Sequence, residues 1–267
     1  MLKQRLVTAL VLIPVLLLIL LAMPRQTAVL VLALMVLQGA WEWSGFLRIE
    51  QTAIRVGYVA LVAVLMATAW FAALDSEVLN LLLAAALGWW LVAFLWLSVM
   101  PGKVSAGAAA LAGLAVLVPA WVALGRLHLV EPAGPQWVIF LLVLVSLADV
   151  GAFFAGRHFG RLKLAPRVSP GKTWEGLFGG MCLAMIVSGI ALLWFSVPAG
   201  PFLALCAAVV LISVIGDLTE SLFKRFAGLK DSGRIFPGHG GVLDRIDSLT
   251  AAAPLFLLGL SWLGVVA

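Results

Sequence analysis

The amino-acid sequence predicts an all-α integral membrane protein. Hydrophobic residues make up 64% of its 267 residues, charged residues make up only 11%, and the mean hydropathy is +1.17. A water-soluble surface needs about 25% charged residues, so the composition excludes a soluble globular domain. The apolar runs are continuous and rich in Leu and Ala rather than alternating, which favours helices over the strands of a membrane barrel.

Nine apolar segments are long enough to cross a bilayer, since a hydrocarbon core of about 30 Å needs about 20 apolar residues per helix. In chain order they occupy residues 6–23, 28–47, 56–74, 78–99, 105–124, 136–156, 176–196, 201–223 and 249–266. The first has the basic start of a signal peptide, which is the alternative interpretation. It is long and no small-x-small cleavage site follows it, so we expect a retained helix.

The distribution of Lys and Arg predicts the topology, because basic residues accumulate in cytoplasmic loops. If the N-terminus is cytoplasmic, that side receives fifteen of the 17 basic residues, and the other side receives only Arg25 and Arg126. We therefore expect nine spans in the cytoplasmic (inner) membrane, with the N-terminus in the cytoplasm and the C-terminus outside. The same bias accounts for most of the net charge of +5, so no nucleic-acid partner is expected.

Polar chemistry is concentrated in the second half of the chain. Two long cytoplasmic segments, 157–175 and 224–248, separate the later spans, whereas the earlier spans have short connections. We expect one polytopic membrane domain, 1–267, in which 1–130 form a lipid-facing scaffold and 131–267 form the catalytic half. No internal repeat of the kind found in many transporters is visible.

Three acidic residues, Glu42, Asp149 and Asp217, lie inside expected spans. A charged side chain inside a bilayer is unfavourable by several kcal/mol, so each marks a functional site by default. Each precedes a basic flank by six to eight residues, which places all three about 10 Å below the cytoplasmic surface. This common depth predicts a polar cavity open to the cytoplasm. For Glu42, which lies between two tryptophans, an interfacial anchor or an interhelical hydrogen bond is an equal alternative.

One helix face combines two acids, a hydroxyl and a base. Asp217, Glu220, Ser221 and Lys224 are spaced i, i+3, i+4 and i+7, which places them on the same face. Carboxylate oxygens suit Mg²⁺ and a lysine suits phosphate. We expect this face to lead from the membrane interior to the following loop, although a purely structural polar stripe is the alternative.

The following loop carries a second group of candidate residues. In PGHGGVLDRID the glycines permit a tight turn close to a ligand, with His239 projecting from it. Asp244 and Asp247 lie one helical turn apart if the last helix begins there, and simple helix capping is the alternative for both. The surrounding basic residues are Lys224, Arg225, Lys230, Arg234 and Arg245. Together these groups predict a polyphosphate site neutralised by cations and by a carboxylate-bound metal.

A third candidate segment, RVSPGKTWEG, precedes the seventh span. Its GKT resembles the end of a P-loop, but Pro166 stands where the glycine is required and we expect no β-strand before it. Ser169, Lys172 and Thr173 remain candidates for phosphate binding where the seventh helix begins, because free N–H groups there favour anions. A capped helix start with Glu175 near the first turn is the alternative.

The polar segment SLFKRFAGLKDSGRIFPGHGGVLDRID, residues 221–247, resembles the signature of phosphatidate cytidylyltransferases, also called CDP-diacylglycerol synthases. The match extends over 27 positions without a departure, and LADVGAFFAGRHFG and SPGKTWEG upstream are also similar to that family. The N-terminal spans are similar only in length and topology. The matching residues are Ser221, Phe223, Lys224, Arg225, Lys230, Asp231, Gly233, Phe236, Pro237, His239, Gly240, Gly241, Val242, Asp244, Arg245, Ile246 and Asp247.

The resemblance implies that CTP and phosphatidate react to give CDP-diacylglycerol and pyrophosphate, with Mg²⁺ held by Asp217 and Asp244. It also implies K⁺ as a possible second ion and a homodimer with a cytoplasm-facing funnel. Expected catalytic residues are Asp217, Asp244, Lys224, His239, Arg245 and Asp247. Expected substrate-binding residues are Ser169, Lys172, Thr173, Ser221, Lys230 and Arg234. Supporting roles are expected for Asp149, Glu175, Glu220 and Asp231.

Two other functions remain as alternatives. A CTP-dependent polyprenol or phytol kinase would move the γ-phosphate instead of the nucleotidyl group. An ion-coupled transporter would use Asp149 and Asp217 as relays, although the long basic loops and the lack of a visible repeat speak against it. A CDP-alcohol phosphotransferase is a weaker rival, because its spaced acidic signature is absent.

Overall fold

The computed structural model describes residues 2–100, 102, 104–236 and 240–266, with side chains from residue 10 onward. Helices account for most of this part of the chain, and one short hairpin is inserted between α6 and α7. The elements are α1 (Leu2–Ala22), α2 (Arg25–Ser44), the 3₁₀ turn η1 (Gly45–Leu47), α3 (Thr52–Ala72), α4 (Ser76–Val99), α5 (Ala106–Leu129), α6 (Gly134–Phe159), β1 (Lys163–Ala165), β2 (Ser169–Thr173), α7 (Trp174–Ala191), α8 (Ala199–Phe226) and α9 (Leu243–Trp262).

Seven helices in the described part, α2 to α8, are long and apolar enough to cross a membrane. They confirm the expected all-α, multi-pass architecture. The described side chains of α1 form a shorter apolar stretch, and α9 begins with three charged residues in its first five positions. Nine spans and the orientation of the termini therefore stay predictions.

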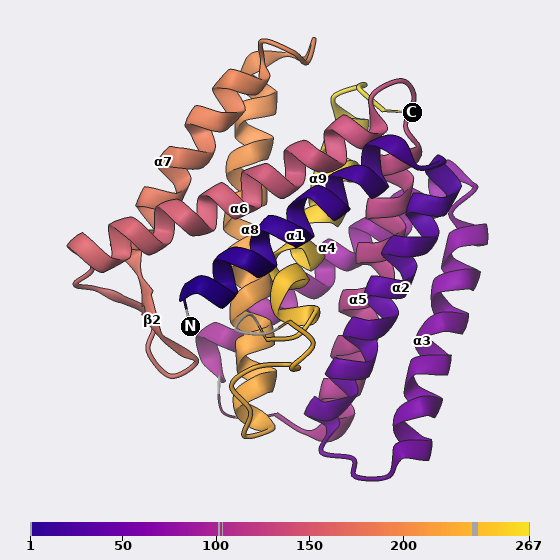
Figure 1. The fold of residues 1–267 in the computed structure, drawn as a ribbon, viewed down its shortest axis with the longest axis vertical. Coiled ribbons are helices and arrows are strands. Elements are labelled where there is room, and N and C mark those ends of the chain that lie inside the picture. The colour runs from indigo at the N-terminus through magenta and orange to yellow at the C-terminus, as the bar shows by residue number, and fades with distance from the viewer. Residues whose placement is uncertain (1, 101, 103, 237–239, 267) are drawn as a thin grey trace.

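Successive helices alternate in direction, so the polar segments gather at one end of the bundle (Figure 1). The β1–β2 hairpin, the C-terminal end of α8 and the N-terminal end of α9 lie there, together with the N-terminal end of α1. We call this the hairpin end. The C-terminal end of α9 lies at the opposite end.

Helix α9 occupies the centre of the bundle. It packs most extensively against α8 and also against α5, α4, α6 and α2. Ala251, Ala252 and Ala253 are fully buried, and such small residues allow helix backbones to approach closely. In α8, a Cβ at Gly216 would lie 2.8 Å from the backbone oxygen of Asp247. This close approach brings the Asp217 region of α8 beside the Asp247 region of α9.

Helices α6 and α7 form the most extensively packed pair, and this pair supports the hairpin. A Cβ at Gly180 would lie 2.5 Å from the Ala148 carbonyl oxygen, and one at Gly151 would lie 2.7 Å from the Gly179 carbonyl oxygen. Glycines on both helices therefore bring the two backbones together, as small residues do in membrane bundles. The hairpin spans the ends of these two helices.

The expectation that no β-strand precedes GKT is wrong. Strand β1 precedes it, and Ser169–Thr173 is itself strand β2, paired antiparallel with Lys163 opposite Thr173 and Ala165 opposite Ser169. Backbone groups outside a helix still need hydrogen-bond partners, and the hairpin supplies them. The P-loop remains excluded, because Pro166 stands where the glycine is required.

Candidate active site

The polar face of α8 has the predicted arrangement. The Ser221 hydroxyl donates a hydrogen bond to Asp217 Oδ1 at 3.3 Å, and Lys224 Nζ lies 3.0 Å from Glu220 Oε1. Glu220 is only 2% exposed, whereas the Asp217 side chain is 26% exposed. The face therefore combines a buried acid with a partly exposed acid.

Lys172 connects the hairpin to this face. Its Nζ lies 2.6 Å from Asp217 Oδ2, and both side chains are about one quarter exposed. The lysine is on strand β2, so its position depends on the hairpin and not on the start of α7. Lys172 of the GKT segment therefore links strand β2 to Asp217 of α8.

Asp244, in the first turn of α9, is held through both carboxylate oxygens. Lys224 Nζ lies 2.7 Å from Oδ1. Oδ2 accepts the backbone N–H groups of Ser232 at 2.9 Å and Gly241 at 2.8 Å, and the Ser232 hydroxyl lies 2.8 Å from it. Charge-assisted hydrogen bonds of this kind are stronger than neutral ones. Asp244 therefore fixes α8, the Ser232 segment and the turn before α9 relative to one another.

Glu42 reaches the same turn from α2. Its carboxylate accepts the backbone N–H groups of Val242 at 3.0 Å and Leu243 at 2.8 Å, and the side chain is nearly inaccessible. Val242, the N-cap residue of α9, makes no side-chain capping bond, so Glu42 acts as the cap from another helix and places negative charge at the positive end of α9. The hydrogen-bonding interpretation of Glu42 is the one that the structure shows.

Ser232 is a site residue that sequence reasoning missed. Its hydroxyl lies 2.9 Å from Glu42 Oε2 and 2.8 Å from Asp244 Oδ2, so it bridges the two carboxylates. The neighbouring glycines leave space for this arrangement: a Cβ at Gly233 would lie 2.6 Å from Glu42 Oε1, and one at Gly241 would overlap Glu42 Oε2. The spacing of Ser232 in the sequence carries no periodic signal that links it to Glu42.

The remaining membrane acids belong to the same electrostatic cluster. Asp149 of α6 lies within electrostatic range of Asp217, Lys172 and Arg245, and its supporting role stays a prediction. The charges of Asp217, Lys224 and Lys172 likewise act on Asp247. Asp247 and Glu220 also line a small void with Trp43, Trp90 and Thr250.

Several predicted residues have other surroundings. Thr173 caps α7 by accepting the Gly176 N–H at 3.1 Å, and Glu175 accepts the Leu162 N–H at 3.1 Å, which ties the hairpin to α7. Ser169 is half-buried on β2. The side chains of Lys230, Asp231, Arg234 and Arg245 are exposed. His239 lies outside the described residues. The start of α7 is therefore capped, as in the alternative interpretation of this segment. The substrate-binding roles of the predicted residues stay predictions.

The donor chemistry suits a hard cation, since aspartate and glutamate oxygens are the ligands Mg²⁺ prefers. Among the residues that the structure describes, none donates a hydrogen bond to the buried Glu220 Oε2, and a free carboxylate oxygen of this kind can accept a further positive group. Within the described residues, however, no three acidic, histidine or cysteine side chains are gathered tightly enough to form a metal site. Asp217 and Asp244 are each paired with a lysine there.

Comparison with known proteins gives a full-length match. The cytidylyltransferase family matches residues 3–263. The phosphatidate cytidylyltransferase of Pseudomonas aeruginosa is 43% identical over 263 residues, 96% of each chain. That of Haemophilus influenzae is 40% identical over 280 residues, 96% of this chain and 97% of its own. That of Brucella suis is 49% identical over 131 residues, 48% of each chain. The chain therefore belongs to the cytidylyltransferase family.

Proposed function

We propose that this protein transfers CMP from CTP to phosphatidate, giving CDP-diacylglycerol and pyrophosphate for phospholipid biosynthesis. The observation that carries the proposal is the convergence of two lysine–aspartate pairs, Lys172–Asp217 and Lys224–Asp244, along α8 in a chain of the cytidylyltransferase family. The pairs lie at the hairpin end of membrane-spanning helices. A lipid headgroup and a soluble nucleotide can both reach such a position.

The chemistry requires charge neutralisation more than proton transfer. A phosphate oxygen of phosphatidate, already ionised near neutral pH, attacks the α-phosphorus of CTP. A new oxygen–phosphorus bond forms as the bond to the β-phosphate oxygen breaks, and pyrophosphate leaves with the electron pair. Lys172 and Lys224 screen the two polyanions and hold them in line, which is the main contribution of a protein to phosphoryl-type transfer.

For the metal, we propose that Asp217 and Asp244 hold Mg²⁺, with Asp247, Asp149 or Glu220 completing or orienting the shell. Bound Mg²⁺ would neutralise phosphate oxygens and the charge on the leaving pyrophosphate. The lysines that pair with the two aspartates would then move to the phosphate groups. K⁺ as a second ion, a homodimer and an active site that faces the cytoplasm belong to the same proposal.

Labelled CTP tests the reaction directly. The purified protein in detergent micelles with phosphatidate and Mg²⁺ should incorporate label from the α-phosphate of CTP into lipid and release label from the γ-phosphate as pyrophosphate. Transfer of the γ-label to a lipid alcohol would instead show a kinase. Solute uptake by vesicles without CTP turnover would favour a transporter. A series with CTP, dCTP, UTP and ATP would define the nucleotide selectivity.

The metal proposal has its own test. Chelation of Mg²⁺ with EDTA should stop CDP-lipid formation, and added Mg²⁺ should restore it, because two polyanions repel each other unless cations neutralise their charge. Full turnover in EDTA would overturn the metal proposal and leave the nucleotidyl-transfer proposal standing.

A further inference from the structure

A large apolar groove lies beside the candidate active site. It has a volume of about 910 Å³, and α4, the hairpin, α7, α8 and one residue of α9 line it. Its lining is aliphatic and aromatic apart from Ser98 and Arg167, which lie at the hairpin end. We call it the α4–α8 groove.

The groove has the length and polarity of one leaflet of a bilayer. Along α8 its lining extends from Leu218 to Ala208, which is about 15 Å at 1.5 Å per residue. The hydrocarbon core of a bilayer is about 30 Å thick, so one leaflet accounts for about 15 Å. Arg167 provides a positive charge at one end, and the rest of the groove is apolar, which matches an anionic headgroup above acyl chains.

The groove shares structural elements with the residues that we assign to the reaction. Leu218 of α8 and Val168 of the hairpin line the groove, so its walls include the two elements that carry Asp217 and Lys172. Trp90 lines both the groove and the small void beside Glu220 and Asp247. A lipid in the groove would therefore place its headgroup at the hairpin end, where the lysine–aspartate pairs also lie.

We propose that the α4–α8 groove binds the acyl chains of the phosphatidate substrate, with Arg167 contacting its phosphate. This inference rests on the proposed function and assigns the lipid a defined position on the protein. A chain bound in the groove is held in one orientation, so its phosphate is presented to the nucleotide in the same way in each turnover.

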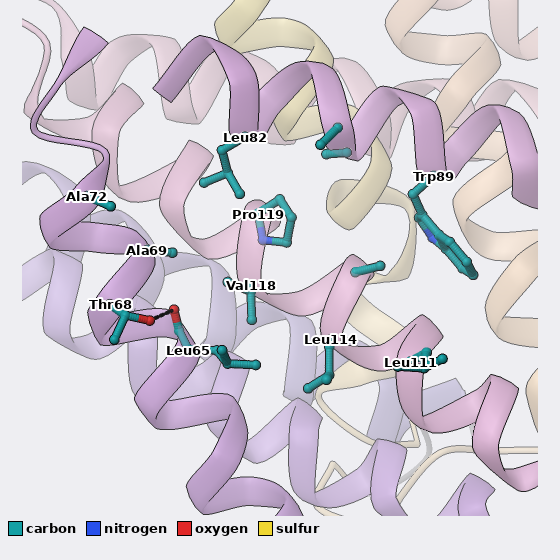
Figure 2. Close-up of a pocket in the computed structure, with 13 residues that line it drawn as sticks. Leu65, Thr68, Ala69, Ala72, Leu82, Trp89, Leu111, Leu114, Val118 and Pro119 are labelled. Carbon is teal, nitrogen blue, oxygen red and sulfur yellow. Dashed lines mark hydrogen bonds between the residues drawn. The ribbon is translucent and has the colours of Figure 1, made fainter. Parts of the chain in front are cut away.

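A second groove provides a natural control. It has a volume of about 560 Å³ between α3, α4 and α5, and Figure 2 shows Pro119, Trp89 and Leu82 around it. Its described lining contains no charged residue, and its Thr68 hydroxyl donates to the Leu65 carbonyl at 3.1 Å. This groove is equally apolar but lacks a cation for a phosphate group.

A tryptophan substituted into each groove in turn distinguishes the proposed lipid site from the control groove. Ala208→Trp occupies the α4–α8 groove, and Ala115→Trp occupies the control groove; both alanines are half-buried on membrane helices. We expect Ala208→Trp to raise the KM for dipalmitoyl phosphatidate about tenfold, the effect of losing burial for about two methylene groups. Its KM for dihexanoyl phosphatidate and for CTP should stay unchanged, and Ala115→Trp should change none of the three.

Equal effects of the two variants, or an equal effect on long and short chains, would overturn the proposal. If Ala208→Trp does not fold, Leu211→Ala should raise the same KM selectively, because it removes apolar surface from the same groove. Arg167→Gln should raise the KM for both phosphatidates, and Arg167→Lys should restore part of the loss. An unchanged KM for phosphatidate in Arg167→Gln would contradict the proposed contact between Arg167 and the phosphate.

A binding measurement on the unmodified protein needs no variant. Phosphatidate with a photoactivatable diazirine on one acyl chain should label α4 and α8 residues of the groove, and excess unlabelled phosphatidate should suppress the labelling. Labelling of the α3–α5 groove, or uniform labelling of the lipid-exposed helices, would contradict the proposal. Exclusion of the probe by a second copy of the chain would assign the groove to a dimer interface. Because α-label transfer is measured separately, loss of the groove proposal leaves the reaction intact.

Discussion

At the scale of single residues, the Asp244 carboxylate joins three segments that are separate in the chain. Lys224 of α8 contacts one of its oxygens, and Ser232 and Gly241 contact the other. A group with this many partners holds its own position firmly. Its negative charge is balanced by Lys224, which is the arrangement that the proposed cation would replace.

Asp244→Asn and Asp217→Asn should each lower turnover by about 100-fold or more, because a neutral amide neither holds Mg²⁺ nor balances the paired lysine. Both variants should elute from size exclusion like the unmodified protein, since asparagine keeps one accepting oxygen. Initial rates with α-labelled CTP measure the effect, with the exposed Glu50→Gln as control. Near-normal turnover in either variant would contradict the assignment of that aspartate to the metal site.

Glu42→Gln should act mainly on stability. The new amide group would face the N–H of Val242 or Leu243, so that one donor loses its acceptor. A buried unsatisfied donor lowers the free energy of unfolding by about 1–3 kcal/mol. The midpoint of thermal unfolding in detergent should therefore fall, with only a modest loss of turnover in the folded fraction. A midpoint equal to that of Glu50→Gln would show that the cap on α9 is dispensable.

At the scale of elements, the α6–α7 pair sets the position of the hairpin and thus of Lys172. Gly180→Ala should lower the free energy of unfolding by about 1–3 kcal/mol, the range for overpacking, because its Cβ would lie 2.5 Å from the Ala148 oxygen. Gly189→Ala on the same helix meets no atom within 4 Å and is the matched control. Thermal unfolding of the two variants measures the difference. Equal midpoints for the two variants would show that α6 and α7 can accommodate the added Cβ at position 180 without a lower free energy of unfolding.

The elements show which parts of the molecule can be predicted from sequence. Apolar runs of sufficient length predicted α2 to α8, and the 3.6-residue period predicted the α8 face from Asp217 to Lys224. The hairpin was missed because its five-residue strand has no apolar alternation. The Lys172–Asp217 pair and the Glu42 cap join segments far apart in the chain, and no local pattern encodes such contacts. The family signature covered Asp244 but gave no indication of Ser232.

At the scale of the whole molecule, the two ends of the chain should lie on opposite sides of the membrane. The nine apolar segments predict an odd number of spans, and the fifteen-to-two distribution of basic residues supports that count. The N-terminal end of α1 and the C-terminal end of α9 lie at opposite ends of the bundle (Figure 1). A reporter active only outside the cytoplasm should therefore work when fused after residue 267 and fail when fused before residue 1. Activity from both positions would require an even number of spans.

The Glu42 cap also has a consequence for biosynthesis. Its partner Val242 lies 200 residues later, and at about 5–20 residues per second the ribosome needs about 10–40 s to reach it. During that interval the nascent chain holds an acidic side chain in its second helix, and its neighbour Gln38, at 3.4 Å, belongs to the same helix. Only the arrival of α9 completes both the cap and the Asp244 network. A chain that ends before α9 therefore contains the seven membrane-crossing helices yet lacks both the Glu42 cap and the Asp244 network.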